Sequence, residues 1–305
     1  MLDRSSKVVY ICSMNTLPLQ KRTQIIRLLV EGNSIRSITR ILDVSKNTVN
    51  KLLVEVGSAC MNFHNDMVKD VKSRRIQADE IWAFVNSKEK NTTAEMKEKG
   101  NGDAWTWVAL DADTKLAVSW HVGNRSAETA TIFMNDVASR LSNRVQITTD
   151  GHHAYLEAVT DAFGSQVDFA QLVKVYGSSS DSNSPTERKY SPSKLKSINK
   201  IPISGNPDED HVSTSYVERQ NLNMRMSMRR FTRLTNAFSK KLENHCHAIA
   251  LHFVYYNWCK IHTTLRVTPA MEAKLTKRVM SIEDIAAMMV DAKPNRPTTY
   301  KKKAA

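Results

Sequence analysis

The chain of 305 residues is long enough for one large domain plus a smaller one, or for two domains of ordinary size, and its 41% hydrophobic and 25% charged residues are typical of a soluble globular protein. No apolar run approaches the ~18 residues that a membrane-spanning helix needs, which excludes a membrane span, and we expect no membrane partner. The formal net charge of +13 favours a polyanionic partner, nucleic acid before an anionic membrane, although the charge also serves solubility.

The N-terminal segment, residues 1–14, is expected to be a disordered extension. Its apolar stretch is short and is preceded by an acid, so it does not resemble a secretory signal. The four cysteines are Cys12, Cys60, Cys246 and Cys259, and none of them is paired in a CxxC spacing. This pattern favours reduced thiols in a cytoplasmic protein over disulfides or a zinc site.

Residues 15–60 predict three helices. The first is followed by Gly32, and Ser34 and Ser45 stand as N-caps of the next two. Two short helices joined by a tight turn and preceded by a longer helix are typical of a helix-turn-helix DNA-binding domain, with a plain helical bundle as the alternative. The third helix would present polar side chains that suit phosphates and base edges, namely Lys46, Asn47, Thr48, Asn50 and Lys51.

After a linker helix at 61–73, alternating apolar and polar residues predict strands. From residue 74 the order is strand, strand, strand, helix, strand, helix, strand and then a helix, the order of a ribonuclease-H-like domain. We therefore expect an α/β fold: a ribonuclease-H-like catalytic domain with a mixed sheet flanked by helices at 74–272, preceded by the all-α helix-turn-helix domain. Ser, Pro and Asn predict an inserted flexible loop at 177–212, either a functional flap or a spacer. Residues 273–305 predict a C-terminal helix and a basic tail.

Three acids stand out by their position in these elements. Asp79 lies in the first strand, Asp150 ends a later buried strand, and Glu218 lies in the first turns of the late helix. In a ribonuclease-H-like sheet the two strands are neighbours, and a helix packed across the sheet brings Glu218 to them. Three carboxylates repel each other unless a divalent cation lies between them, and oxygen ligands select Mg²⁺ or Mn²⁺. Two such ions can cleave and join phosphodiesters.

Plainer readings exist for two of these acids. Glu80 is adjacent to Asp79, and strand alternation sends the two side chains to opposite faces; we favour Asp79 as the inward one. Asp150 stands before Gly151, which also fits a turn aspartate. The helix after Glu218 is basic, and its side chains would hold the DNA backbone. The residues predicted to contact DNA there are Arg219, Asn221, Arg225, Arg229 and Arg230.

Three blocks occur in order along the chain: ADEIW with Asp79, TTDG with Asp150, and YVERQNLNMRMSMRRFTRLTNAFSKK with Glu218. Together they resemble the DDE transposases of the insertion sequence one type. The later segment YYNWCKIHTTLRVTPAMEA is similar to one near the end of many transposases and retroviral-type integrases.

The resemblance implies an enzyme dependent on Mg²⁺ or Mn²⁺, with Asp79, Asp150 and Glu218 as catalytic residues and metal ligands. It would bind the terminal inverted repeats of its element, cleave the ends and join them to target double-stranded DNA in the cytoplasm, at the nucleoid. Pairing of two ends implies a homodimer or a larger assembly. Two alternatives are a helix-turn-helix regulator on an inactive ribonuclease-H-like scaffold and a ribonuclease-H-like nuclease acting on hybrids or junctions.

Overall fold

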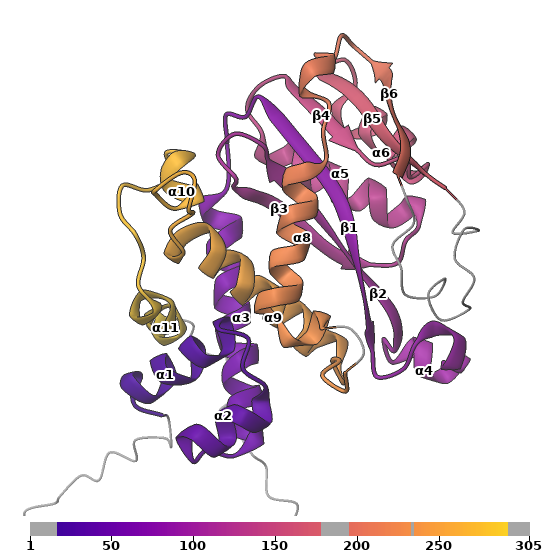
Figure 1. The fold of residues 1–305 in the computed structure, drawn as a ribbon. Helices are drawn as coiled ribbons and strands as arrows, with labels where there is room; N and C mark the ends of the chain where they lie inside the picture. Colours follow the sequence, from indigo (N-terminus) through magenta and orange to yellow (C-terminus); the bar gives the residue numbers. More distant parts are fainter. Residues whose placement is uncertain (1–16, 178–194, 233–234, 292–305) are drawn as a thin grey trace, which may run out of the picture.

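A computed structural model describes residues 17–177, 195–232 and 235–291. The expected N-terminal extension, the first half of the expected loop and the basic tail lie outside these ranges. The described chain contains a six-stranded mixed sheet flanked by helices, which confirms the α/β expectation (Figure 1). None of the helices within the described ranges has the length and apolar character to cross a membrane.

The sheet has β1 at its centre. Its spatial order is β3-β2-β1-β4-β5-β6, with β1 antiparallel to β2 and parallel to β4, β4 parallel to β5, and β6 antiparallel to β5 at one edge. The strands are β1 Arg75–Val85, β2 Gly102–Asp111, β3 Ala117–Gly123, β4 Val145–Thr149, β5 Val167–Tyr176 and β6 Leu195–Ser204.

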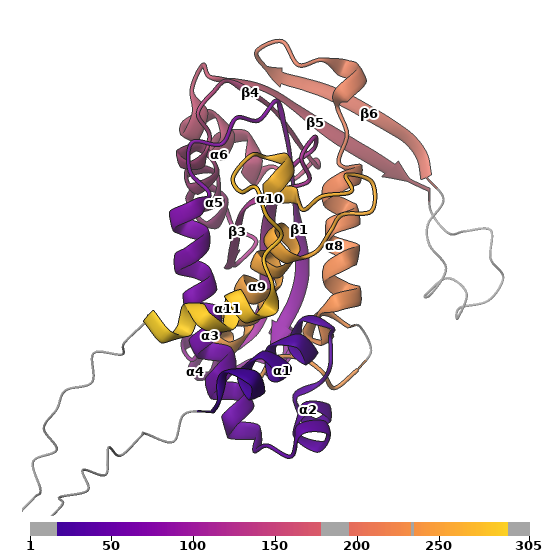
Figure 2. The same cartoon turned by 90° about the vertical axis from the view of Figure 1, so that its left-hand side faces the viewer.

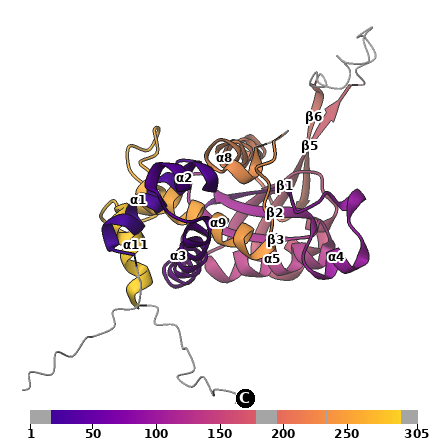
Figure 3. The same ribbon diagram turned by 90° about the horizontal axis from the view of Figure 1, so that it is seen from below.

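Two layers of helices cover the sheet on opposite faces, as Figure 3 shows for α5 and α8. On one face, Trp107 of β2 packs on Phe133 of α5 and Tyr155 of α6. On the other, Trp120 of β3 packs on α3 and α9, and α8 crosses β1 and β2. The larger helices are α3 Lys46–Met67, α5 Ala127–Arg140, α6 Ala154–Phe163, α8 Ser215–Ser227 and α9 Leu242–Val254.

Shorter elements complete the fold. A π-helical turn, Tyr255–Cys259, continues α9. Between β1 and β2 the chain forms a 3-10 turn and α4. The remaining bounds are Glu89–Asn91 for that 3-10 turn, Ala94–Glu98 for α4, Pro269–Glu272 for α10 and Ile282–Asp291 for α11.

The three helices expected between residues 15 and 60 are present as α1 Leu19–Val30, α2 Ile35–Leu42 and the first part of α3. Both predicted serine caps are confirmed: the Oγ of Ser34 accepts a hydrogen bond from Ser37 N, and the Oγ of Ser45 accepts one from Thr48 N, each at 3.0 Å. The separate linker helix expected at 61–73 is wrong, because α3 runs without a break from Lys46 to Met67.

A glycine allows this long helix to lie close to α9, in the helical layer on the sheet. A Cβ atom added at Gly57 of α3 would lie 2.3 Å from the Cβ of His247 on α9 and 2.7 Å from its carbonyl oxygen. Such distances are well inside van der Waals contact, so only glycine fits at this crossing. The N-terminal helices are therefore packed directly on the helical layer of the sheet (Figure 2).

The expectation of a flexible loop at 177–212 is wrong for its second half, which contains a strand and a 3-10 turn. Residues Leu195–Ser204 form β6, which pairs with β5 from Phe169 to Tyr176, and Glu209–His211 form a 3-10 turn. The Ser, Pro and Asn content hid this strand, yet an edge strand tolerates Pro202 because its ladder is paired on one side only.

The helix that carries Glu218 is α8, which ends at Ser227. Met228 leaves the helical conformation, and Arg229–Phe231 form a 3-10 turn. The apolar side chains of this segment are buried in the core, namely Val217, Met224, Met228 and Phe231.

Candidate active site

Parallel pairing of β1 with β4 brings the first two acids together. Ala78 pairs with Thr149, so the next residue on each strand, Asp79 and Asp150, is an acid at adjacent positions. Because α8 crosses the same face, Glu218 lines the same cavity of about 520 Å³ as these two acids. Residues predicted from three separate sequence blocks therefore share one site.

The carboxylate of Asp79 is held at both of its oxygens. Its Oδ1 accepts a hydrogen bond from Glu80 N, and its Oδ2 accepts one from Asn221 Nδ2, both at 2.9 Å. Burial, followed by repulsion from Asp150, raises the pKa of Asp79 to about 6. A group with this pKa is readily deprotonated by a nearby cation, as a metal ligand must be.

Glu80 is a member of the acidic cluster that sequence analysis set aside. Its side chain leaves β1 on the face opposite to Asp79 and is only 1% exposed. Even so, one carboxylate oxygen each from Asp79, Glu80 and Asp150 can be chosen so that all lie within 4.8 Å of one another. Burial, with repulsion from Asp150 and Asp79, raises the pKa of Glu80 to about 8. The buried hydroxyl of Tyr155 lies beside this carboxylate and partly offsets the rise in its pKa.

Asp150 is the most accessible of these three acids. Its side chain is 37% exposed, and its Oδ1 accepts a hydrogen bond from His152 N at 3.0 Å. The guanidinium of Arg125 lies 3.8 Å from Asp150 Oδ2 and 3.4 Å from Glu80 Oε2, so it joins the two carboxylates.

Glu218 lines the cavity but its carboxylate is engaged elsewhere. Its Oε1 accepts a hydrogen bond from Thr214 Oγ1 at 2.6 Å and forms an ion pair with Lys174 of β5. Glu218 therefore lies outside the tight cluster of Asp79, Glu80 and Asp150, although its charge contributes to the raised pKa of Asp79.

Two cations of this site, Arg125 and Lys174, were not identified from sequence. Arg125 follows β3 and Lys174 lies near the end of β5, and neither stands in a motif. Both line the cavity beside the acids. Only the pairing of strands distant in sequence reveals that these positive groups face the carboxylates.

The donors suit a hard divalent cation. All of the converging ligand atoms are carboxylate oxygens, which Mg²⁺ and Mn²⁺ prefer, and no soft Cys or Met donor lies among the cavity residues. Clustered carboxylates repel one another, and a cation between them would offset that cost.

The residues predicted to bind DNA fall into separate places. Asn221 is buried and bonded to Asp79 rather than exposed, while Arg219 is exposed on α8. Thr48 shares a hydrogen bond between its Oγ1 and Ser45 Oγ at 2.9 Å. Asn47 and Lys51 are accessible on α3, Arg225 is half-buried, and Lys46, Asn50, Arg229 and Arg230 line a second cavity of about 600 Å³.

Comparisons with known proteins give structural similarity alone. No protein-family model and no curated protein matches the chain. Among solved structures, the chain is similar to a Mos1 transposase paired-end complex with left transposon end, at 13% identity and a TM-score of 0.23, covering 50% of this chain and 59% of that one. It thus spans about three fifths of that Mos1 chain.

Two further solved structures are similar. One is a cryo-EM structure of a piggyBac transposase synaptic complex with hairpin DNA, at 10% identity and a TM-score of 0.41, covering 91% of this chain and 73% of that one. The other is the Mos1 strand transfer complex, at 12% identity and a TM-score of 0.24, covering 79% and 76%. Similarities this distant decide nothing about activity, so the function has to follow from the residues.

Proposed function

We propose that the protein is a metal-dependent DDE transposase that cleaves and joins DNA strands at the ends of its element. The observation that carries the proposal is the convergence of Asp79, Asp150 and Glu218, from three separate sequence blocks, on one cavity. The strand order, with β1 beside β4, supports a ribonuclease-H-like catalytic unit. The resemblance of the same blocks to transposases of the insertion sequence one type supports the reaction.

Different residues of the site would bind the cation and orient its ligands. Asp79 and Asp150 would hold Mg²⁺ or Mn²⁺, with Glu80 close enough to add an oxygen. When bound, such a cation activates a water or 3′-hydroxyl and stabilises the leaving oxygen of a phosphodiester. Asn221 orients the Asp79 carboxylate through their hydrogen bond.

The positive side chains of the cavity suit the substrate. Arg125 and Lys174 lie beside the acids, where their N–H groups can donate to the phosphate oxygens of a DNA strand. The ion pair that engages Glu218 with Lys174 is exposed enough to rearrange, since their side chains are 42% and 26% exposed. Glu218 would then turn toward Asp79 when a cation is bound.

DNA-end recognition is assigned to the N-terminal helices. We propose that α2 and α3 form a helix-turn-helix whose exposed Lys46, Asn47 and Lys51 contact duplex DNA. The separation of these residues from the acids fits a division between binding and chemistry. Pairing of two ends would need a homodimer or larger assembly, acting at the nucleoid as the resemblance implies.

The test is cleavage of DNA that flanks the gene and carries its terminal inverted repeats, with Mg²⁺ or Mn²⁺. Asp79→Asn, Asp150→Asn and Glu218→Gln should each abolish cleavage while DNA binding persists. Asp161→Asn, which neutralises an exposed acid on α6, is the matched control and should cleave normally. Cleavage retained by any triad variant would contradict the assignment.

Two other outcomes would identify the alternative functions. Salt-sensitive binding without metal-dependent nicking would identify a regulator, and preferred cleavage of hybrids or junctions would identify a different nuclease.

A further inference from the structure

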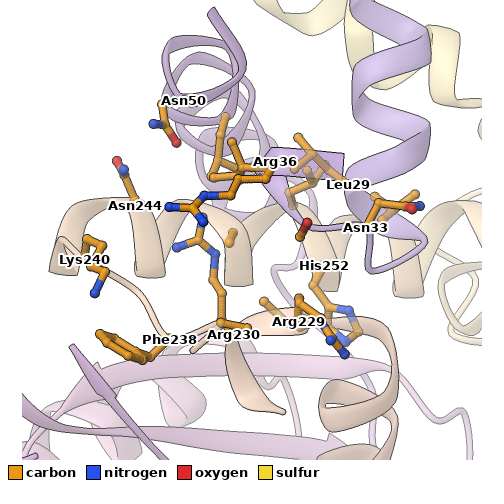
Figure 4. A pocket seen from close by; sticks show the side chains of 18 of the residues that line it. Leu29, Asn33, Arg36, Asn50, Arg229, Arg230, Phe238, Lys240, Asn244 and His252 are labelled. Carbon is orange, nitrogen blue, oxygen red and sulfur yellow. The ribbon is translucent and has the colours of Figure 1, made fainter. Parts of the chain in front are cut away.

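A second cavity, of about 600 Å³, lies between the N-terminal helices and the end of α8 (Figure 4). One wall is formed by α1, α2 and α3, and the other by the 3-10 turn after α8, by residues 236–241 and by α9. Six cations line it, and none of the lining residues is an acid. These cations are Arg36, Lys46, Arg229, Arg230, Lys240 and Lys241.

None of these six cations forms an ion pair with a carboxylate of the described ranges. Figure 4 shows Arg36 and Arg230 reaching into the cavity from opposite walls and pointing toward one another. Two guanidinium groups that face each other repel, and an anion between them would offset this cost.

Arg230 is the most constrained of these groups. Its NH1 donates a hydrogen bond to Ser239 Oγ at 2.9 Å. Burial lowers the pKa of its guanidinium to about 10, which reflects the cost of holding this charge away from water. The guanidinium of Arg230 has five N–H donors, and the Ser239 hydroxyl takes one of them. The other N–H groups can donate to the oxygens of a phosphate.

Other lining groups suit a nucleotide. Phe238 is half-buried at the wall with Lys240 Nζ 3.7 Å from its ring centroid, and an aromatic ring beside cations is the usual platform for an unstacked base. The buried Oδ1 of Asn50 has no hydrogen-bond partner in the described chain, and Asn244 lies across the cavity from it (Figure 4). Such amides can pair with base edges.

We propose that this cavity binds a segment of one DNA strand, unpaired from its complement, by its phosphates and one or more bases. The volume matches a nucleotide-sized ligand and is too small for a duplex, whose major groove alone is about 12 Å wide. That the strand is DNA rests on the proposed function. The site lies at the C-terminal end of α8, and this helix of 13 residues spans ~20 Å from the end that carries Glu218.

The test is binding of a fluorescent single-stranded oligonucleotide of about twelve nucleotides, within the ~4–16 that such sites occupy, by anisotropy in EDTA. The variant Arg36→Ala/Lys240→Ala removes one exposed cation from each wall. The control Lys72→Ala/Arg74→Ala removes the same two residue types from exposed positions outside the cavity.

We expect the cavity variant to raise Kd for the single strand about tenfold or more, as for the loss of two charge-assisted contacts. Each phosphate contact on a single strand contributes ~0.7 to the magnitude of the slope of log K against log salt. Loss of two contacts should therefore reduce that magnitude by about 1.4. The control, and the binding of a blunt duplex by either variant, should change less than about threefold. Arg36→Gln/Lys240→Gln keeps most of each side-chain stem and should give the same result if the alanine variant melts early.

Single-strand binding equal to that of the control would overturn the site, and so would an equal loss of single-strand and duplex binding. Cleavage is measured separately, with metal. A protein that binds the strand through this cavity but never cleaves DNA would leave the site standing and reject the proposed function. A protein that cleaves but whose cavity variants bind like the control would reject the site alone.

Discussion

Asn221 of α8 donates a hydrogen bond from its Nδ2 to Oδ2 of Asp79 on β1, at 2.9 Å, and joins residues 142 positions apart in the chain. Asn221 is 4% exposed, so the bond is protected from water. The other oxygen of Asp79 is fixed by Glu80 N. The Asp79 carboxylate is therefore oriented by two donors before any cation arrives.

Replacing Asn221 tests this orientation. Asn221→Ala should lower the cleavage rate and weaken the apparent metal affinity by about 10–100-fold, the usual effect of removing a group that orients a metal ligand. The Kd for DNA should hardly change, and added metal should restore part of the rate. Asn223→Ala on the same helix, which bonds Gln220 instead, is the control. Equal rates for the two variants would show that the bond is structural only.

The pairing of Glu218 with Lys174 predicts competition between this lysine and a metal cation. Lys174→Met removes both the partner of Glu218 and a positive charge that repels a cation. The Mg²⁺ concentration that gives half of the thermal stabilisation should therefore fall several-fold. Lys200→Met, on the exposed edge strand, should leave it unchanged. An unchanged or raised concentration for Lys174→Met would contradict a ligand role for Glu218.

Gly57 is predicted to be essential for stability rather than for chemistry. Gly57→Ala places a methyl group against the backbone of His247 and should lower the free energy of unfolding by about 1–3 kcal/mol, despite alanine's better helix propensity. Ser58→Ala, one residue along on the exposed side of α3, should be neutral or slightly stabilising. Urea denaturation measures both, and a stabilised Gly57→Ala protein would show that the two helices separate easily.

Acid should destabilise the protein through His64. Its Nε2 lies 3.0 Å from Val118 O, and burial, with Arg140 nearby, lowers its pKa to about 3. The unfolded chain takes up this proton near pH 6.5, so stability present above 6.5 is lost as pH falls toward 3, by up to about 1.4 kcal/mol per pH unit. His64→Gln should make the pH dependence of unfolding shallower in that window, whereas the exposed His153→Gln should not.

Much of the site's framework follows from sequence pattern. Period and length predicted the strands that carry Asp79 and Asp150, and a parallel β1–β4 pair then forces the two residues together. Serine caps placed the starts of α2 and α3 because their side chains satisfy free N–H groups locally. Features that depend on neighbouring residues, such as strand periodicity and helix caps, can therefore be predicted from the sequence.

The rest depended on tertiary structure. Strand alternation gives the direction of the Glu80 Cβ, not the point that a three-bond side chain reaches, so its carboxylate was missed. Arg125 and Lys174 become site residues only through neighbouring strands. The edge strand β6 was missed because its Ser, Asn and Pro content is typical of loops and its side chains are exposed.

The account depends most on a divalent cation held by Asp79 and Asp150. A crystal of the protein soaked in Mn²⁺ and measured at the manganese absorption edge tests this directly. We predict an anomalous peak in the cavity with carboxylate oxygens of both residues within about 2.0–2.2 Å, and its loss in Asp150→Asn. A Mn²⁺ ion bound elsewhere, or a cavity that stays empty while both carboxylates keep their present contacts, would contradict the central claim.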